Sequence, residues 1–468
     1  MKFARLIFPA AILMAGCAPM GPDYKRIDVE TPSHFKESGV WKFARPADHL
    51  PRGSWWTIFG DSTLNRLQGQ AAADNPGLRA AMLRVEQARN IARGSTAQLL
   101  PTLSFNPSAT REGESENVRR SNDDTRAFEG TRNTFNLPLD AGYEIDFWGK
   151  VRRGIEAARA DADAAAALGE TVRLTLQADL AQTYFTLRSV QAEIEILQGT
   201  VELRQKALTL LRNRFEGGAT SELDVSRAET ELTGSQSELT GMKRRRIELV
   251  NAIATLAGRP ASSFDLTVKA LVGAPPGIPS GIPADLLQRR PDIAEAERRM
   301  AAANARIGVA KAAFFPSIRL LGGVGLESSQ TKNLFESGSR TWSLGSLINV
   351  PIFEQLVNRT NYKGKKLEYE ETTANYQSTV LRAFQEVENS LSGLRLLAEQ
   401  ASVQERAVAA SQKAARLSTD RYQAGLVSFL EVVDADRTRL QSLQLARQIA
   451  GQRYLTAVQL IKAIGGGW

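Results

Sequence analysis

The chain has 468 residues, of which 43% are apolar and 24% charged, and its formal net charge is +8. Such a chain buries a large core, yet no internal stretch approaches the ~20 apolar residues that a membrane-spanning helix needs. The positive charge does not indicate nucleic-acid binding. The one dense basic run, Lys243–Arg246, lies in a helical pattern between Glu238 and Glu248, which is typical of a solvated helix face.

The first residues have the pattern of a secretory signal. Basic residues precede an apolar run from Leu6 to Met14, and two small residues then stand before Cys17. A basic start, an apolar centre and small residues at the cleavage site are the parts of such a signal. The LMAGC ending resembles a bacterial lipoprotein lipobox, with Met14 where leucine is usual. We therefore predict a lipoprotein signal peptide at residues 1–16 and lipidation of Cys17.

The cellular location of the protein is predicted from the same junction. Cys17 is the only cysteine, which excludes an internal disulfide and a metal site with several cysteines. Lipidation would supply the two or more acyl chains that stable anchoring requires. Ala18 follows, and an aspartate there would indicate retention in the inner membrane, so the outer membrane is favoured. The alternative is that the lone thiol has no role. An exported protein seldom meets nucleic acid, so we expect outer membrane lipid, not nucleic acid, as a partner.

Residues 17–75 are predicted to form the lipid anchor, at Cys17, and a mostly extended segment. The segment is rich in proline and aromatic residues and has no sustained period. The WWTIFGD run at Trp55–Asp61 starts the first ordered helix. A repeat then follows at residues 76–260, a proline-rich linker at 261–283, and a second repeat at 284–468. The opening helical patterns, Gly77–Leu99 and Asp292–Phe314, are bounded by Pro76 and Pro101 and by Pro291 and Pro316, and both pairs of prolines are 25 residues apart. Equal spacing indicates two copies of one unit.

After the second proline of each pair, the period becomes alternating. Apolar residues alternate with small or polar ones from Phe135 to Ile145 and from Trp342 to Ile352. Strands with one apolar face are typical of sheets that contact lipid on one side and water on the other. We expect four strands per chain, in two pairs. The alternative is a half-buried sheet in a soluble domain.

Two long helices follow the strand pairs. The chain has no proline from about Arg152 to Phe215, and its apolar residues fall on a heptad seam that Val380–Ala398 repeats. At ~1.5 Å per residue such a helix is on the order of 90 Å long. The returning helices, about Ser221–Leu256 and Ser428–Ile464, are shorter. We expect each to stack end to end with the opening helix of its repeat, beside the long helix. The predicted seam residues of the first helix are Leu180, Tyr184, Leu187, Ile194, Leu197, Val201, Leu208, Leu211 and Phe215.

The strongest sign of duplication is the turn between the long and returning helices. RFEGGATSELDVSRA at Arg214–Ala228 is a weaker copy of RYQAGLVSFLEVVDADR at Arg421–Arg437. In both, an aromatic residue and a glycine end one helix, and a serine followed by a carboxylate starts the next. This pattern is typical of a capping box, in which the serine hydroxyl accepts from a free backbone N–H group. Each copy is therefore predicted to be the tip of a helical hairpin.

Four strands cannot close a membrane-spanning barrel, which needs at least about eight, and an open sheet edge cannot lie in lipid. If the strands span a membrane, the chain must form an oligomer. An enzyme is not indicated. The only histidines, His34 and His49, lie in the irregular N-terminal segment, and we find no nucleophile elbow, phosphate loop, metal motif or cofactor motif.

The chain resembles the outer membrane factor family, which is TolC-like, and specifically its NodT-type lipoproteins. The resemblance covers essentially the whole chain after Cys17. It rests on the WWTIFGD run, on YEIDFWGK at Tyr143–Lys150, on LLQRRPDIAEAERR at Leu286–Arg299, on ANARIGVAKAAFFPSI at Ala303–Ile318 and on the closing IGGGW at Ile464–Trp468.

The resemblance implies an α+β fold in which long helical hairpins form a trimeric helical tunnel beside a transmembrane β-barrel built from four strands per protomer. It implies a homotrimer that acts as the outer membrane exit duct of a tripartite efflux system and extends into the periplasm. A periplasmic adaptor, or membrane fusion protein, and an inner-membrane efflux pump are the implied partners. It implies no particular cargo, adaptor or resting state, because the pump selects what such a duct carries.

Functional roles at the tips also come from the resemblance. Glu431 and Asp434 match the acidic positions that line the periplasmic aperture, although helix capping and solvated charge are the alternatives. The tips match the regions that meet the adaptor, and the residues concerned are Gly217, Gly218, Ser221, Leu223, Asp224, Gly425, Ser428 and Leu430. Two other functions stay open: a duct for type I protein secretion, and a periplasmic adaptor lipoprotein, which would have one hairpin rather than two.

Overall fold

The structure is a computed structural model that describes residues 19–28, 32, 35–36, 54–113, 131–278 and 289–466. The predicted signal peptide, Cys17, Ala18 and both histidines lie outside the described residues. The chain forms two compact units. The first comprises the described parts of Met1–Ile27, Glu86–Ala164 and Glu297–Asn375, and the second those of Asp28–Val85, Ala165–Ala296 and Tyr376–Trp468.

The first unit contains an antiparallel sheet with the strand order β1, β3, β4, β5, in which β2 also pairs with β3. The prediction of four strands is corrected to five, because β1 and β2 are separate strands that lie along the same edge of β3. Pro107 lies between β1 and β2 and has no N–H to donate, so it interrupts the ladder. The strands are β1 (Thr102–Phe105), β2 (Ser108–Gly113), β3 (Thr131–Ile145), β4 (Ser317–Ser328) and β5 (Arg340–Asn349).

The register gives this sheet one apolar face. Leu139 pairs with Val324, and Val324 pairs with Trp342, so all three side chains lie on the same side. The face is uncovered, since Trp342 is 80% exposed and Leu344 is 82% exposed. The predicted alternation is therefore confirmed as far as Asn349; it is wrong at Val350 and Ile352, which lie beyond the end of β5. Residues of this face are Leu103, Phe105, Phe135, Leu137, Leu139, Ala141, Tyr143, Ile145, Ile318, Leu320, Val324, Leu326, Trp342, Leu344 and Ile348.

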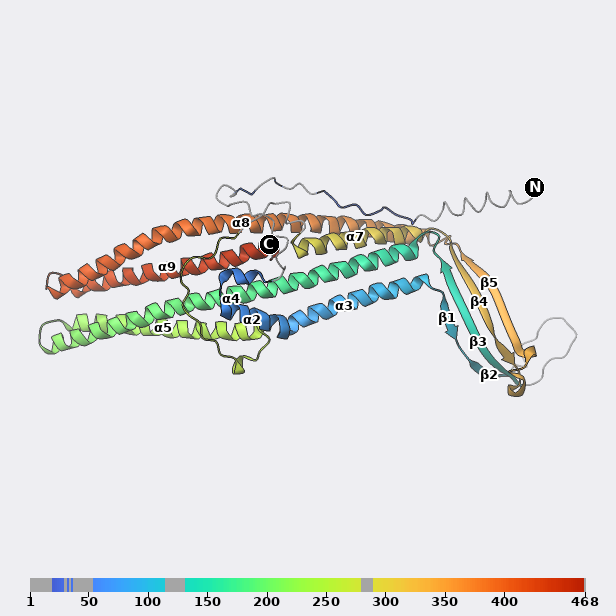
Figure 1. The fold of residues 1–468 in the computed structure, drawn as a ribbon, viewed down its shortest axis with the longest axis horizontal. Helices are drawn as coiled ribbons and strands as arrows, with labels where there is room; N and C mark the ends of the chain where they lie inside the picture. The colour runs from blue at the N-terminus through green and yellow to red at the C-terminus, as the bar shows by residue number, and fades with distance from the viewer. Residues whose placement is uncertain are drawn as a thin grey trace. The chain divides into compact units, whose positions relative to one another are not determined.

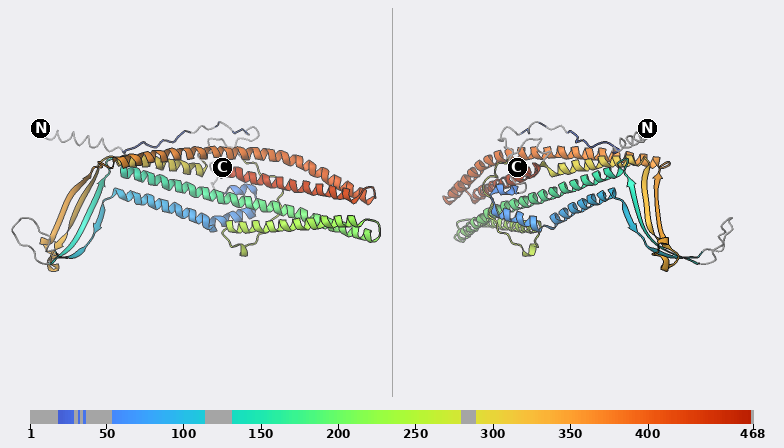
Figure 2. Two further views of the ribbon diagram at one scale, coloured as in Figure 1. Left: turned by 180° about the vertical axis from the view of Figure 1, so that it is seen from behind. Right: turned by 45° about the vertical axis from the view of Figure 1, so that its right-hand side comes forward.

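Most of the chain is helical, and two pairs of helices form hairpins. Figures 1 and 2 show α4 returning as α5 and α8 returning as α9. None of the helices in the described part of the chain has an apolar stretch long enough to span a membrane. The α-helices are α2 (Ser62–Asp74), α3 (Pro76–Thr96), α4 (Lys150–Glu216), α5 (Glu222–Leu256), α7 (Pro291–Ala312), α8 (Gln355–Gln423) and α9 (Phe429–Ala463). Short 3₁₀ helices are η1 (Trp55–Phe59), η2 (Ala97–Leu99), η3 (Ala261–Ser263), η4 (Thr331–Asn333) and η5 (Ser337–Ser339).

The second unit is built around the predicted seam of α4. Leu180, Leu187 and Leu197 are fully buried there, and they belong to one core with residues of α2, α5, α8 and α9. The seam prediction is wrong at its last position, because Phe215 is 43% exposed. In α8 the seam is buried at Val380, Val387, Leu391 and Leu394 and half-buried at Phe384, but its last predicted residue, Ala398, is exposed.

Returning and opening helices meet at their ends within the second unit. The Asn75 side chain accepts from Leu78 N at the start of α3 and donates to Leu256 O at the end of α5. Arg290 stands in the same place before α7 and donates to Ala463 O at the end of α9. Each side chain thus satisfies a carbonyl group that a helix end leaves free. These contacts support the predicted end-to-end stacking in both repeats.

The segment predicted as mostly extended contains the 13-residue helix α2. Its Asp61 accepts from Thr63 N and Leu64 N and so caps the helix, as the start predicted at Trp55–Asp61 requires. The other Asp61 oxygen accepts from Tyr184 and Arg188 of α4. The extended description therefore does not hold for Ser62–Asp74, because a capped helix buries its apolar side in the core.

Candidate functional site

Both hairpin tips close in the same way. Gly218 has a φ of 77° and Gly425 a φ of 72°, a left-handed conformation that side chains disfavour. At the first tip Ala219 N donates to Arg214 O, and at the second Leu426 N donates to Arg421 O. These bonds reach back past the glycine and satisfy the last carbonyl groups of α4 and α8. The predicted duplication of the tip is confirmed.

The two caps differ. The Ser221 hydroxyl accepts from Asp224 N at 3.3 Å, and the Asp224 carboxylate accepts from the Ser221 hydroxyl. Ser428 stands at the corresponding position before α9, but its side chain makes no capping hydrogen bond. The acid of the second tip, Glu431, accepts instead from Arg421 at 3.0 Å. The capping-box prediction is thus wrong at the second tip, where a guanidinium binds the carboxylate more strongly than a hydroxyl would.

The remaining predicted tip residues are on the surface. Leu223 and Leu430 are exposed although apolar, as is their neighbour Leu426. Gly217 and Gly425 are exposed as well. The structure therefore brings apolar side chains to both tips, where a partner protein could cover them.

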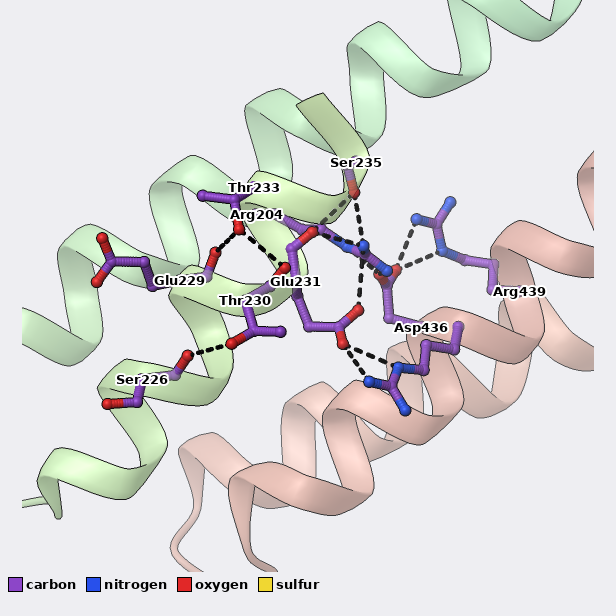
Figure 3. A network of polar contacts seen from close by, with 10 residues as sticks. Arg204, Ser226, Glu229, Thr230, Glu231, Thr233, Ser235, Asp436 and Arg439 are labelled. Carbon is purple, nitrogen blue, oxygen red and sulfur yellow. Dashed lines mark hydrogen bonds and ion pairs between the residues drawn. The ribbon is translucent and has the colours of Figure 1, made fainter. Parts of the chain in front are cut away.

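Behind the tips, a network of polar contacts joins the two hairpins (Figure 3). Arg204 of α4 donates to Glu231 O at 2.9 Å and to the Ser235 hydroxyl at 2.6 Å, both on α5. The same guanidinium donates to Asp436 of α9 at 3.1 Å. Arg439 holds the other Asp436 oxygen, at 2.7 Å.

A second link runs through Glu231. One of its carboxylate oxygens lies 3.1 Å from Arg204. The other accepts from Arg437 Nε of α9 at 2.9 Å. Hydrogen bonding to Glu231 raises the pKa of Arg437 above its usual value, so this group stays charged. Arg204 and Glu231 are only 13% and 12% exposed, and such burial is tolerated because each charge has partners.

Apolar packing accompanies the network. A small core lies between the tips and the network, separate from the main core of the second unit. It takes residues from α4, α5 and α9, namely Leu208, Leu211, Ala228, Leu232, Phe429 and Val433. Opening the contact between the hairpins would therefore break ion pairs and expose apolar surface together.

The predicted aperture residues lie on α9, between its first turn and the network residue Asp436. Glu431 is paired with Arg421, while Asp434 is exposed and lies close enough to Arg437 for its charge to help raise the pKa of that guanidinium. Asp434 therefore adjoins the network through Arg437, whereas Glu431 pairs with Arg421 outside it.

Sequence reasoning missed Arg204, Glu231 and Arg439. The offset of 207 residues that relates Ser221 to Ser428 also relates Arg204 to Ser411 and Glu231 to Thr438. A charge in one repeat that the other repeat lacks was the signal that could have found them.

The comparisons with known proteins agree on one family. A model described as outer membrane efflux protein matches residues 67–259 and 282–466. The chain belongs to the outer membrane efflux protein family. The predicted family and the outer membrane location are thereby confirmed. Because the match includes most of both repeats, the hairpins and the sheet are parts of the family fold.

Individual relatives carry transport names. The solvent efflux pump outer membrane protein SrpC of Pseudomonas putida is 32% identical over 475 aligned residues, which cover 100% of this chain and 99% of the relative. The cation efflux system protein CusC of Escherichia coli O6:H1 is 30% identical over 466 residues, covering 99% and 98%. The solved outer-membrane channel OprN superposes with a TM-score of 0.88 at 29% identity, covering 96% of this chain and 99% of that one. The predicted α+β fold class is confirmed, and the relatives' names describe transport rather than catalysis.

Proposed function

We propose that the chain is the exit duct of a tripartite efflux system, through which small molecules leave the periplasm across the outer membrane. The single observation that carries this proposal is the pairing of an uncovered apolar sheet face with two long helical hairpins in a member of this family. The apolar sheet face is suited to contact with lipid, and the long hairpins are suited to form the wall of a water-filled tunnel. The relatives' efflux names favour this function over type I protein secretion.

Three copies would assemble the duct. Four strand positions leave two open edges, and edges in lipid must pair. Three copies would give a barrel of twelve strands, the number that the family resemblance implies. The exposed leucines at the tips, Leu223, Leu426 and Leu430, would meet a periplasmic adaptor, which in turn would link the duct to an inner-membrane pump.

Glu431 and Asp434 would ring the periplasmic mouth. They are three residues apart on α9 and so share a helix face. Three copies would bring six carboxylates around one axis, where like charges repel and cations are attracted. Opening would then require an adaptor that binds the open arrangement more tightly than the closed one.

The mouth can be tested in planar bilayers. We expect the purified protein to form conducting channels that divalent cations block. Replacing both Glu431 and Asp434 by alanine should raise the concentration of divalent cation needed for half block several-fold, because the ring of charge is lost. Asp224→Ala is the matched control, since Asp224 holds the position equivalent to Glu431 at the other tip. If the purified protein formed no conducting channels, the proposed function would be refuted. If the double variant were blocked by divalent cations as the unmodified protein is, only the role of these two acids would be refuted.

A lipid anchor at Cys17 would hold the first unit at the membrane. Met20, three residues later, donates its N–H to Trp148 O just after β3, and Arg153 donates to Met20 O. The described residues nearest in sequence to the predicted lipidation site are thus held beside the segment that follows β3. An anchor there would suit a sheet that lies in the membrane.

The anchor can be tested by metabolic labelling. Cys17→Ser should abolish incorporation of labelled palmitate, because no other cysteine is available. Trp148→Phe, which keeps the backbone carbonyl that Met20 contacts, should label like the unmodified protein. Palmitate that persists in Cys17→Ser would rule the anchor out.

A further inference from the structure

A cavity of about 490 Å³ lies beside the polar network, between the two hairpins of the second unit. All four hairpin helices contribute to its wall. The apolar part of the wall includes Leu203 and Ala207 of α4, Ala415 of α8, and Phe429 and Val432 of α9. Its size falls within the ~300–1,000 Å³ range of small-molecule sites, which are mostly apolar with a few convergent polar groups.

The cavity wall has more basic than acidic side chains. Two acids face the cavity, Glu231 and Asp436, and three arginines, Arg204, Arg416 and Arg439. Both acids are already bound, since Arg204 and Arg437 hold Glu231 while Arg204 and Arg439 hold Asp436.

The remaining cation is Arg416. Among the residues that the structure describes, no acid pairs with it, although it lines the cavity. It is exposed at the rim, one helical turn from Gln412 and from Thr419, which also line the wall. A ligand that entered would therefore meet an apolar interior, one free guanidinium and two neutral polar side chains.

We propose that this cavity binds a small organic anion with an apolar body, such as an aromatic carboxylate or sulfonate. The apolar body would lie against Phe429 and Val432, and the anionic group would lie against the Arg416 guanidinium, which binds carboxylates in a bidentate way. A cation is disfavoured, because the acids have no free oxygen to offer it. Because both hairpins form the wall, a bound anion stabilises their packing.

The test uses the full-length protein purified in an uncharged detergent and 4-benzoylbenzoate, a photoreactive aromatic carboxylate. After irradiation, mass spectrometry locates the labelled peptides. We expect saturable labelling in peptides that carry Leu203–Ala207 or Phe429–Val433, and competition by naphthalene-2-sulfonate. Neutral 4-methylbenzophenone reports partition into the micelle and should label these peptides far less.

Variants separate the parts of the proposal. Arg416→Gln should raise the probe concentration needed for half-maximal labelling about tenfold, which is the loss of affinity expected for a charged hydrogen bond. Arg416→Lys keeps the charge but loses the bidentate geometry, so its affinity should lie between those of Arg416→Gln and the unmodified protein. Lys413→Gln, on α8 outside the cavity wall, should change nothing. Ala207→Phe fills the cavity and should abolish labelling there. Labelling of Arg416→Gln that equals the unmodified protein, or no labelling of these peptides in the assembled protein, would overturn the proposal.

Discussion

Glu193 is a buried carboxyl group of α4 outside the network and outside the proposed cavity wall. Burial raises its pKa, because water no longer solvates the charge, and the nearby carboxylate of Glu238 acts in the same direction. A hydrogen bond with Gln448 of α9 opposes them. The neutral form of Glu193 is therefore favoured in the folded state relative to the unfolded one.

This shift predicts a pH dependence of stability. The folded pKa lies above the unfolded one, so the contribution is present at low pH and is lost as pH rises through the folded value. Glu193→Gln cannot charge and keeps a polar partner for Gln448. We expect its melting temperature to match that of the unmodified protein near pH 4 and to exceed it at pH 8. Exposed Glu195→Gln is the control and should shift neither value. An equal difference at both pH values would contradict this explanation.

At the scale of elements, local patterns predicted most of the fold. The absence of proline and the glycine at the tip placed both ends of α4 to within a few residues, because both limits are set by neighbouring residues. For α8 the glycine placed the end in the same way, but the start at Gln355 was not predicted. Alternation placed β3 and β5 for the same reason. The break at Pro107 was missed, since a short strand before a proline has too few residues to show a period.

The contacts between elements were less predictable. Arg204 lies 232 residues from Asp436, and nothing near either residue indicates the other. Ser428 resembles Ser221 in sequence, yet only Ser221 makes its capping bond, and the acid of the second tip binds Arg421 instead of a serine hydroxyl. Side-chain competition of this kind depends on which helix faces which, and a periodic pattern does not contain that information.

At the scale of the whole molecule, the sheet is incomplete as a single copy. The edge strand β5 has every residue exposed, and β1 and β2 form the other edge. Each edge leaves N–H and C=O groups without a partner strand in the sheet. In lipid each such group costs several kcal/mol, so the proposed membrane location requires both edges to pair with further copies.

The resulting prediction concerns the oligomer. Native mass spectrometry of the protein in detergent should give about three times the mass of one mature chain, whose full sequence weighs 51.1 kDa. Trp342→Asp places a charge on the apolar face of β5, which is destabilising in lipid. The fraction of protein that remains trimeric after heating should therefore fall. Thr341→Asp is the matched control, because successive residues of a strand point to opposite faces and the charge then faces away from lipid. A folded protein with the mass of one chain would leave both edges unpaired and would refute the proposed barrel and the tunnel together.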